Sequence, residues 1–484
     1  MNMTLTQLQT WLPEAVVVAG EPDTNTLAQG LIKAVRTDSR SVVAGDLFVA
    51  LKGEKYDGAT FLVQAQSQGA VAVLFEGQQP FSSELLQCLK EVSVPAYCVP
   101  NARVALGELA AQWRRQFELE LIGVTGSNGK TTVTQMIASV LRADVSNPSV
   151  STQGNLNNEI GVPLTLFNLR PEHRRAVVEL GMNHPGEIEV LARYAQPTIG
   201  LVNNAQREHQ EFMSSVEAVA IENAEVIRNL PANGVAVFPA QDAYTEVWQK
   251  LAGARQVMTF GFTQGDVQAH QIAWVNGAWS FQLTTAHAAC ACHLNIAGRH
   301  NILNALAAAA CALAAGMRLS DIAKGLENFE PVKGRSKSSA WQIQGHAFTL
   351  IDDTYNANPD SVRAAIEVLA ELPAPRLLVL GDMGEVGQQG PEFHREVGAY
   401  AKELGVQALF TLGDLCAHSS HAFEGAEHFA NMDSLQQAVL DQISTFKSVL
   451  VKGSRFMKME RVVDKLSSQL EHAPALERES AHVA

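Results

Sequence analysis

The residues best suited to chemistry stand in one short stretch, "GSNGKTT", which follows an apolar run and precedes a helix-like one. Glycines let a backbone close around phosphates, and a helix that begins here presents its N–H groups and positive end to an anion. Lys130 can reach terminal phosphates, and Thr131 can ligate Mg²⁺. Val124 stands where the strict P-loop pattern has glycine, so we predict a variant phosphate cradle for ATP; the alternative is a plain glycine-rich turn. The predicted ATP-binding residues here are Gly126, Ser127, Asn128, Gly129, Lys130, Thr131 and Thr132.

Two further polar side chains follow predicted strands of the same series. Glu179 ends the run "VVELG", and His209 lies just past the run "GLVNN". Because the carboxyl ends of parallel strands meet at one edge of a sheet, both side chains are expected to face the phosphate cradle. With Thr131 they form the predicted Mg²⁺ ligand set. Taken singly, Glu179 is also typical of a helix-capping or salt-bridged acid, and His209 of a satisfied loop histidine.

The overall charge argues against nucleic acid as a partner. The 484 residues include 36 Lys+Arg against 50 Asp+Glu, a formal net charge of −14, whereas neutralising a phosphate backbone requires a basic patch. No segment approaches the ~20 apolar residues of a membrane span, and the first residues lack a basic start followed by an apolar block. We therefore expect a cytoplasmic protein without membrane insertion.

The cysteines indicate reduced thiols rather than a disulfide framework. Six in so long a chain are too sparse for such a scaffold. The segment "CACH" at 290–293 has the wrong inner spacing for zinc and no second ligand pair nearby. It favours a strand with alternating faces.

The elements that position these residues follow from hydrophobic period and punctuation. From Leu119, short apolar runs alternate with helical ones, which indicates a parallel sheet covered by helices on both faces. A second such series starts near residue 345, after a segment rich in charge, proline, glycine and serine. We expect an α/β protein with domains at 1–100, 101–329 and 330–484, since 484 residues are too many for one ordinary core.

Several separated motifs resemble the Mur ligase family of peptidoglycan synthesis, and the resemblance covers nearly the whole chain. They are "TDSR" at 37–40, "TGSNGKTT" at 125–132, "GNLNNEIGVPLTL" at 154–166, "ELG" at 179–181, "GRHNILNALAAAA" at 298–310, "DDTYNANPDS" at 352–361 and "LVKGSR" at 450–455. The resemblance implies a smaller mixed α/β N-terminal domain holding the UDP end of the substrate. It further implies a central P-loop ATPase with a mostly parallel sheet and a C-terminal Rossmann-like domain that closes on both.

The resemblance also implies an activity. A carboxylate acylates poorly, so ATP would first phosphorylate it; an amine would then attack the mixed anhydride and release phosphate. The motifs imply UDP-N-acetylmuramoyl-tripeptide and D-alanyl-D-alanine as substrates and ATP and Mg²⁺ as cofactors. Separately, we expect a monomer. Lys130 and Mg²⁺ would offset the charge that builds on the transferring phosphoryl group.

Nucleotide contacts outside the cradle are carried over from the same resemblance. His300 and Asn301 would lie by the adenine and ribose, and Asn356 would also contact the nucleotide. Arg335 and Asp353, from the last domain, would reach it only when the domains close.

Substrate contacts are carried over in the same way. The "TDSR" loop would meet the UDP moiety, although alone it is typical of an ordinary polar turn. The asparagine-rich loop would contact the muramoyl-peptide, and the end of a late strand would receive the dipeptide carboxylate. The residues are Thr37, Asp38, Ser39 and Arg40; Asn155, Asn157 and Asn158; and Lys452, Ser454 and Arg455.

Three other activities are weighed against this one. A ligase that adds a diamino acid would carry an Asp-Asn-Pro-Arg element in its last domain, and this chain has none. A folylpolyglutamate synthase would share the P-loop but not "DTYNANP". A nucleotide-gated binding module with idle ATPase activity would release phosphate without needing both substrates.

One position departs from the family pattern. Mur ligases usually carry a lysine, carbamylated by CO₂, on the helix after the histidine strand. Asn223 stands there, and no lysine occurs between Lys130 and Lys250. We expect a helix opened by a Ser214–Glu217 capping box, with Asn223 facing the ATP site and ordering a metal-bound water or phosphate oxygen. The alternatives are an asparagine bonded to a neighbouring loop, and Glu222 as the weaker substitute.

Overall fold

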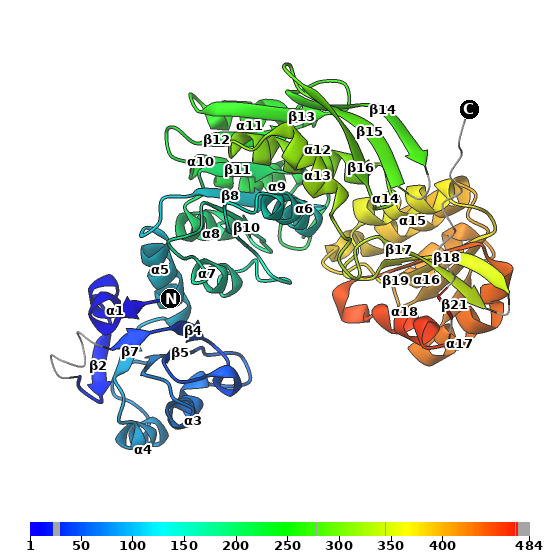
Figure 1. Ribbon diagram of the computed structural model, residues 1–484. Coiled ribbons are helices and arrows are strands. Elements are labelled where there is room, and N and C mark those ends of the chain that lie inside the picture. The colour runs from blue at the N-terminus through cyan, green and yellow to red at the C-terminus, as the bar shows by residue number, and fades with distance from the viewer. Residues whose placement is uncertain (23–29, 276–277, 344, 470, 473–484) are drawn as a thin grey trace.

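A computed structural model of the chain describes residues 1–22, 30–275, 278–343, 345–469 and 471–472, and it arranges them in three units (Figure 1). Each unit contains one large β-sheet. The middle unit lies between the other two, with the N-terminal unit in blue on one side and the C-terminal unit in yellow to red on the other. None of the helices in these ranges is long and apolar enough to cross a membrane.

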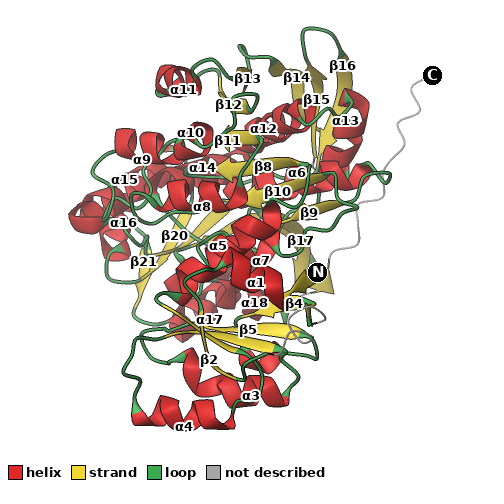
Figure 2. Ribbon diagram, turned by 90° about the vertical axis from the view of Figure 1, so that its left-hand side faces the viewer, coloured by secondary structure: helices red, strands yellow, loops and turns green. Residues whose placement is uncertain are grey.

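The first unit is a five-stranded sheet covered on both faces. The order is β2-β7-β6-β5-β4, with β2 antiparallel and the others parallel. Figure 2 shows α3 and α4 on one side and α1 and α5 on the other. The elements are β1 (Met3–Thr4), α1 (Leu5–Trp11), β2 (Val16–Ala19), β3 (Leu31–Ile32), β4 (Ala34–Arg36), β5 (Asp46–Ala50), α3 (Leu62–Ser67), β6 (Ala72–Glu76), α4 (Ser83–Glu91), β7 (Ala96–Val99) and α5 (Ala102–Arg114).

The middle unit is built on a nine-stranded sheet. Its order is β16-β15-β14-β13-β12-β11-β8-β10-β9, parallel from β9 to β14 and antiparallel beyond. The strands are β8 (Glu120–Thr125), β9 (Ser149–Ser151), β10 (Arg175–Glu179), β11 (Ile199–Val202), β12 (Val235–Pro239), β13 (Gln256–Gly261), β14 (Val267–Val275), β15 (Ala278–Thr284) and β16 (Ala289–Leu294). The helices are α6 (Lys130–Ala143), α7 (Gly161–Leu166), α8 (Glu187–Ala195), α9 (Val216–Asn223), α10 (Glu225–Arg228), α11 (Thr245–Ala252), α12 (His300–Ala314) and α13 (Leu319–Glu327).

The third unit is a seven-stranded sheet in the order β21-β20-β19-β22-β18-β17-β23. It is parallel from β21 to β18 and antiparallel at β17 and β23. The elements are β17 (Lys337–Ile343), β18 (His346–Asp353), α14 (Pro359–Glu371), β19 (Arg376–Gly381), α15 (Gly390–Glu403), β20 (Ala408–Leu412), α16 (Cys416–Phe423), β21 (Glu427–Phe429), α17 (Met432–Gln442), β22 (Ser448–Lys452), α18 (Glu460–Ser467) and β23 (Glu471–His472).

The α/β fold class and both alternating series are confirmed, with additions at the sheet edges. The antiparallel hairpin β15–β16 and the strands β17 and β23 extend sheets whose centres are parallel. The "CACH" segment lies in β16, where Cys292 is buried and His293 is exposed. The predicted start of α9 was one residue early, because the Ser215 hydroxyl accepts from the Ala218 amide and caps the helix.

The sheet centre positions the functional edge. Strand β8 lies between β10 and β11 and is parallel to both. Its residues from Leu121 to Thr125 are buried, as expected for a strand covered on both faces. The carboxyl ends of β8, β10 and β11 therefore meet at one edge, which carries the P-loop, Glu179 and the segment containing His209.

Candidate active site

The P-loop connects β8 to α6 through two glycines in the left-handed region. The φ angles are +128° at Gly126 and +80° at Gly129. A Cβ at Gly129 would lie 2.6 Å from Asn304 Oδ1, so both the backbone conformation and the space require glycine. Helix α6 begins at Lys130 without a side-chain cap. Its first-turn N–H groups are therefore suited to bind an anionic ligand.

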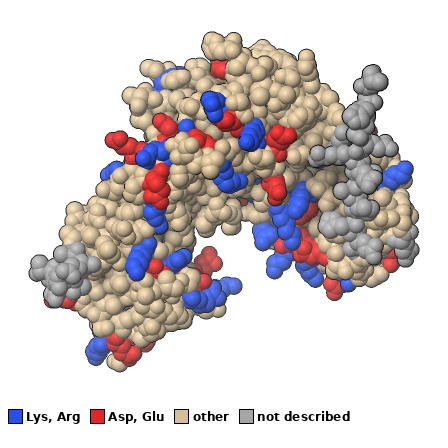
Figure 3. Space-filling model, in the orientation of Figure 1, with Lys and Arg blue, Asp and Glu red and all other residues tan. Residues whose placement is uncertain are grey.

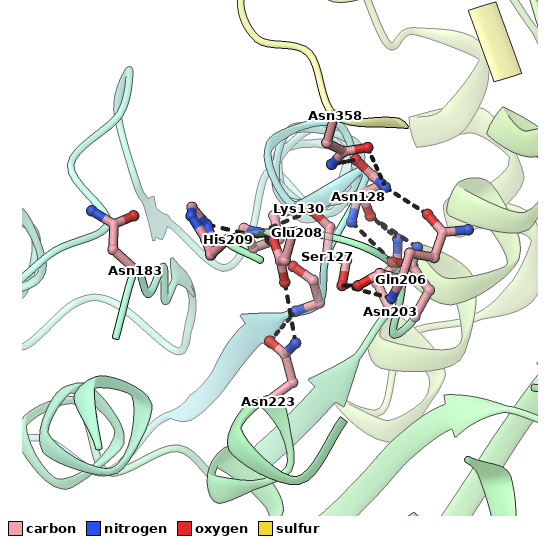
Figure 4. A network of polar contacts seen from close by, with 12 residues as sticks. Ser127, Asn128, Lys130, Asn183, Asn203, Gln206, Glu208, His209, Asn223 and Asn358 are labelled. Carbon is pink, nitrogen blue, oxygen red and sulfur yellow. Dashed lines mark hydrogen bonds and ion pairs between the residues drawn. The ribbon is translucent and has the colours of Figure 1, made fainter. Parts of the chain in front are cut away.

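The underside of the loop contacts amide side chains from the end of β11 and the end of α9 (Figure 4). The Gly126 amide donates to Asn223 Oδ1 at 2.8 Å, and the Asn128 amide donates to Asn204 Oδ1 at 2.9 Å. The Asn128 carbonyl accepts from the side-chain amides of Asn203 and Asn204 at 2.8 and 2.9 Å. These bonds fix the shape of the loop from below.

Lys130 is held at the mouth of the cradle by groups of the protein itself. Its Nζ donates to the carbonyls of Gly126 and Ser127 at 2.5 and 3.2 Å and to Glu208 Oε2 at 3.1 Å. The Glu208 side chain is 5 % exposed. To meet a phosphate, the ammonium group must exchange at least one of these partners.

Glu179 has the features of a metal ligand. Its side chain is buried, and Oε1 accepts from Thr131 Oγ1 at 3.1 Å and from Asn157 Nδ2 at 2.8 Å. The other oxygen, Oε2, is buried without a hydrogen-bond partner. A buried carboxylate oxygen with no donor is costly unless a cation compensates it. The residues present therefore fit Mg²⁺, with Thr131 and Glu179 as the residues that would hold it.

His209 lines the same cavity as the P-loop and Glu179, as predicted, but its ring contacts carboxylates. Nδ1 lies 2.5 Å from Glu385 Oε2, in poor hydrogen-bond alignment, and Nε2 lies 3.7 Å from Glu208 Oε2. His209 lowers the pKa of the Glu385 carboxyl. Both ring nitrogens face carboxylates, which favours ion pairing over metal ligation. Metal binding by His209 stays a prediction.

Asn223 does not face the nucleotide site as expected. Its side chain is 1 % exposed and is absent from the residues that line the cavity above the loop. Oδ1 accepts from the Gly126 amide, and Nδ2 donates to Glu208 Oε1 at 3.4 Å. Asn223 therefore supports the loop from beneath, as the alternative interpretation had it. Glu222 is turned away as well, because Oε1 accepts from the Ile188 amide at 3.0 Å in α8.

The P-loop opens into a cavity of about 780 Å³ that the middle and third units line together. The third unit contributes Arg335, Asp353, Asn356 and Lys452. The Arg335 guanidinium lies 4.0 Å from the centre of the Tyr355 ring. Arg335 and Asp353 were expected to approach the P-loop only on closure, but here they already line the same cavity.

His300 and Asn301 line this cavity at the start of α12. Burial lowers the pKa of His300, although part of its surface remains open. The Asn301 amide is held from within, since Nδ2 donates to the Ala297 carbonyl at 2.7 Å and Oδ1 accepts from Asn304 at 2.9 Å. Their contacts with a nucleotide stay predictions.

Of the predicted substrate residues, the "TDSR" loop lies apart from the cavity, in the first unit. It follows β4, and the Asp38 side chain caps a short 3₁₀ turn. Asp38 and Arg40 are exposed and form an ion pair at 2.7 Å. The hydrogen bonds from Arg40 lower the pKa of Asp38 to about 2. In Figure 3, Lys and Arg side chains lie on both walls of the hollow between the first and third units, interspersed with Asp and Glu.

Some of the other predicted substrate residues line the shared cavity, and some lie outside it. Asn157, Asn158 and Lys452 line the shared cavity, whereas Asn155 is exposed outside it. Lys452 Nζ contacts Asp353 Oδ2 at 2.5 Å. Arg455 is exposed and pairs with Glu460 at 3.1 Å.

Ser454 has no free hydroxyl proton for a carboxylate. It is buried; its Oγ donates to the Ala357 carbonyl at 3.1 Å and accepts from the Gly384 amide at 2.6 Å. The structure thus supports Lys452 rather than Ser454 as the strand-end residue that faces a ligand.

Sequence reasoning missed the residues that join the P-loop to the third unit. Arg207 donates to Asp360 at 2.6 Å and to Glu396 at 2.7 Å, and these bonds raise the pKa of Arg207. Asn358 Nδ2 donates to Asn128 Oδ1 at 2.9 Å. The segment "QREH" at 206–209 is rich in polar groups, but its partners lie far along the chain.

Comparison with known proteins identifies the family. The Mur ligase family, catalytic domain, matches residues 31–114; the Mur ligase middle domain matches 124–312; and the Mur ligase, glutamate ligase domain, matches 341–455. The chain is 39 % identical over 448 residues to the UDP-N-acetylmuramoyl-tripeptide–D-alanyl-D-alanine ligase of Haemophilus influenzae, covering 91 % of this chain and 94 % of that protein. The chain belongs to the Mur ligase family.

Two further similarities support the assignment of this Mur ligase. The corresponding ligase of Escherichia coli strain K12 is 39 % identical over 437 residues, with 89 % of this chain and 93 % of that protein covered. A crystal structure of MurF from Acinetobacter baumannii superposes with a TM-score of 0.86 at 34 % identity, covering 97 % of this chain and 99 % of that one. Mur ligases are ATP-dependent, ADP-forming amide ligases that use Mg²⁺.

Proposed function

We propose that this Mur ligase joins D-alanyl-D-alanine to UDP-N-acetylmuramoyl-tripeptide at the cost of one ATP, in peptidoglycan precursor synthesis. The observation that carries the proposal is the shared cavity. An uncapped helix start, Lys130 and the unpartnered Glu179 oxygen lie in its wall together with residues of the third unit. The identity to the Haemophilus influenzae and Escherichia coli ligases names the substrates.

The chemistry follows from what these residues can hold. The first-turn amides of α6 bind the phosphate chain of ATP, and Lys130 offsets the charge on the phosphoryl group as it passes to the peptide carboxylate. The acyl phosphate that forms is attacked by the amine of the dipeptide, an amide bond forms, and phosphate leaves with the electron pair of the broken C–O bond. Bound Mg²⁺ would supply further positive charge at the phosphates.

The residues of the third unit give the second half of the site. Arg335 and Lys452 bring positive charge to the cavity, and Asp353 fixes Lys452. We assign Arg335, Asp353 and Asn356 to the nucleotide and Lys452 to the dipeptide end. A cavity closed by two domains keeps water from the acyl phosphate.

The remaining assignments are part of the same proposal. The exposed loop at 37–40 takes the UDP end, and Lys and Arg side chains, interspersed with Asp and Glu, lie on the walls of the hollow in Figure 3. We place domain boundaries at 1–100, 101–329 and 330–484, in keeping with one large sheet in each. We further propose a cytoplasmic monomer that binds neither nucleic acid nor membrane, since both substrates and ATP are small molecules.

The test is product analysis with the full chain. The protein is mixed with ATP, Mg²⁺, UDP-N-acetylmuramoyl-tripeptide and D-alanyl-D-alanine. The products are identified by mass spectrometry, and the released phosphate is quantified. We expect one phosphate per amide bond and none when either substrate is omitted. Phosphate release without the dipeptide would instead indicate idle ATPase activity.

A further inference from the structure

One buried carboxylate in the cavity wall has no part in the function proposed above. Glu208 follows β11, lines the cavity and is 4 % exposed. Its Oε2 contacts Lys130 at 3.1 Å and His209 at 3.7 Å. Oε1 receives one long bond, 3.4 Å, from the Asn223 amide (Figure 4). An ionised carboxylate has about four acceptor sites, so Glu208 keeps capacity for another partner.

Glu208 and Glu179 flank the first turn of the same helix. Lys130 and Thr131 are consecutive at the start of α6; Lys130 contacts Glu208, and Thr131 contacts Glu179. Glu179 Oε2 is buried with no partner. Two buried acids beside bound phosphates repel them unless a cation lies between. Carboxylate oxygens and phosphates are the ligands that Mg²⁺ prefers.

We propose that Glu208 is a second fixed carboxylate of the Mg²⁺–nucleotide site and that Asn223 is its positioning residue. This inference rests on the proposed function, because it requires ATP in the cradle. When Lys130 turns to the phosphates it frees Glu208 Oε2, and that oxygen would then be available to hold the cation.

Asn223 keeps the carboxylate in place during this exchange. Its side-chain amide donates to Glu208 Oε1 and accepts from the Gly126 backbone N–H, so the carboxylate keeps its position relative to the P-loop. No lysine occurs between Lys130 and Lys250. Here the negative charge is supplied by the chain itself, without CO₂.

The experiment measures Mn²⁺ binding by electron paramagnetic resonance on the full chain with a non-hydrolysable ATP analogue. Glu208→Gln should weaken Mn²⁺ at least tenfold, and Glu208→Asp should fall between it and wild type. Asn223→Ala should weaken it several-fold. The matched control is Glu211→Gln, the same change three residues on at an exposed side chain, which should stay within twofold of wild type.

Analogue affinity without metal separates the proposal from a role in anchoring Lys130. Glu208→Gln should bind the analogue as tightly as wild type or more tightly, since a repelling charge is removed. Unchanged Mn²⁺ affinity, or weaker analogue binding without metal, would overturn the proposal. If Glu208→Gln does not fold, Glu208→Asp and Asn223→Ala decide it by the same criteria. Product formation by wild type is scored separately, so failure of the ligase assignment is recognised on its own.

Discussion

Two clusters of polar side chains in this protein, both largely buried, differ in how far the fold satisfies them. One is the P-loop cluster of Lys130, Glu179 and Glu208. The other, in the third unit, consists of Asp382, His394 and Cys416, whose ligand atoms lie within 4.8 Å of one another. In the described parts of the chain this second cluster is the group of three whose side chains are closest to metal-ligand geometry.

The second cluster is satisfied from within. Asp382 accepts from the amides of Cys416 and Leu415 at 2.7 and 3.3 Å. His394 Nε2 accepts from the Met383 amide at 3.0 Å. His394 Nδ1 lies 2.7 Å from the Gly390 carbonyl and donates to it, since a carbonyl can only accept. A metal ion would have to displace these bonds.

The P-loop cluster, in contrast, retains binding capacity. Glu179 Oε2 has no partner, and Glu208 and Lys130 line a cavity. Clustered acids and histidines therefore do not by themselves mark a site. The informative feature is polar capacity that the fold has left unsatisfied next to open volume.

The largest effect is expected at Lys130, which faces the phosphates of ATP in the proposed site. Lys130→Ala should lower product formation at least a thousandfold, about 4 kcal/mol, with an unchanged circular dichroism spectrum. The reason is the loss of the charge facing the transferring phosphoryl group. Lys250→Ala, on the exposed end of α11, is the control. Product formation above a thousandth of the wild-type rate would contradict the catalytic role that distinguishes Lys130 from the second cluster.

The satisfied cluster should respond in the opposite way. Asp382→Ala leaves the buried Cys416 amide and the half-buried Leu415 amide without an acceptor. It should destabilise the third unit by about 2–4 kcal/mol, measured by urea unfolding. Turnover per folded molecule should stay within about twofold. Asp433→Ala, at a side chain that is 87 % exposed, should leave stability unchanged. A stable but inactive Asp382→Ala would move this cluster into the active site.

Substitution of Asn223 should affect both activity and stability, because this buried side chain supports the P-loop. Asn223→Ala should reduce turnover about tenfold and cost about 1–3 kcal/mol of stability, because the buried Gly126 amide loses its acceptor. Activity of wild type should be indifferent to removal of CO₂ and bicarbonate, and added bicarbonate should not restore the variant. Strong bicarbonate dependence of wild type would refute this account.

Arg335 tests whether the third unit takes part in nucleotide use. Arg335→Ala should raise KM for ATP about tenfold, since one of the cations in the cavity wall is lost. Lys333→Ala, at an exposed ion pair two residues away, is the control. Because the middle and third units already share the cavity, small-angle scattering with an ATP analogue and UDP-tripeptide should show a smaller radius of gyration only as the first unit closes on the other two. An unchanged radius would contradict domain closure.

The smallest expected effect is a pH dependence of the satisfied cluster. Burial lowers the pKa of His394 and nearby His418 acts in the same direction, whereas the hydrogen bond to the Gly390 carbonyl and the charge of Asp382 oppose the shift. The unfolded state therefore binds the proton first. Stability is full above the ordinary pKa of 6.5 and is lost as pH falls from there toward the lower folded value. Thermal unfolding at pH 7.5 and 5.5 should show a smaller difference in His394→Gln than in wild type.

Much of the fold was predictable because its causes are local. The alternation of apolar runs and helices placed the P-loop between β8 and α6, and Glu179 was recognised from its place at a strand end. The strand at 290–293 was predicted with alternating faces, as found in β16. The antiparallel pairing at the sheet edges was not foreseen, since edge pairing depends on partners distant in sequence. The domain boundaries and the ligand contacts of individual residues stay predictions.

The sequence by itself determined the phosphate cradle, because glycines with positive φ, a lysine and a helix start are set by neighbours in the chain. Only the tertiary structure decided which polar groups remain unsatisfied. Asn223 was expected to face the nucleotide, yet the fold turns it to Gly126 and Glu208, residues 97 and 15 positions away. No feature of the sequence around Glu208 indicated that this residue would line the site. Hydrogen-bond satisfaction is a property of all the groups that packing brings together, so it cannot be read from local spacing.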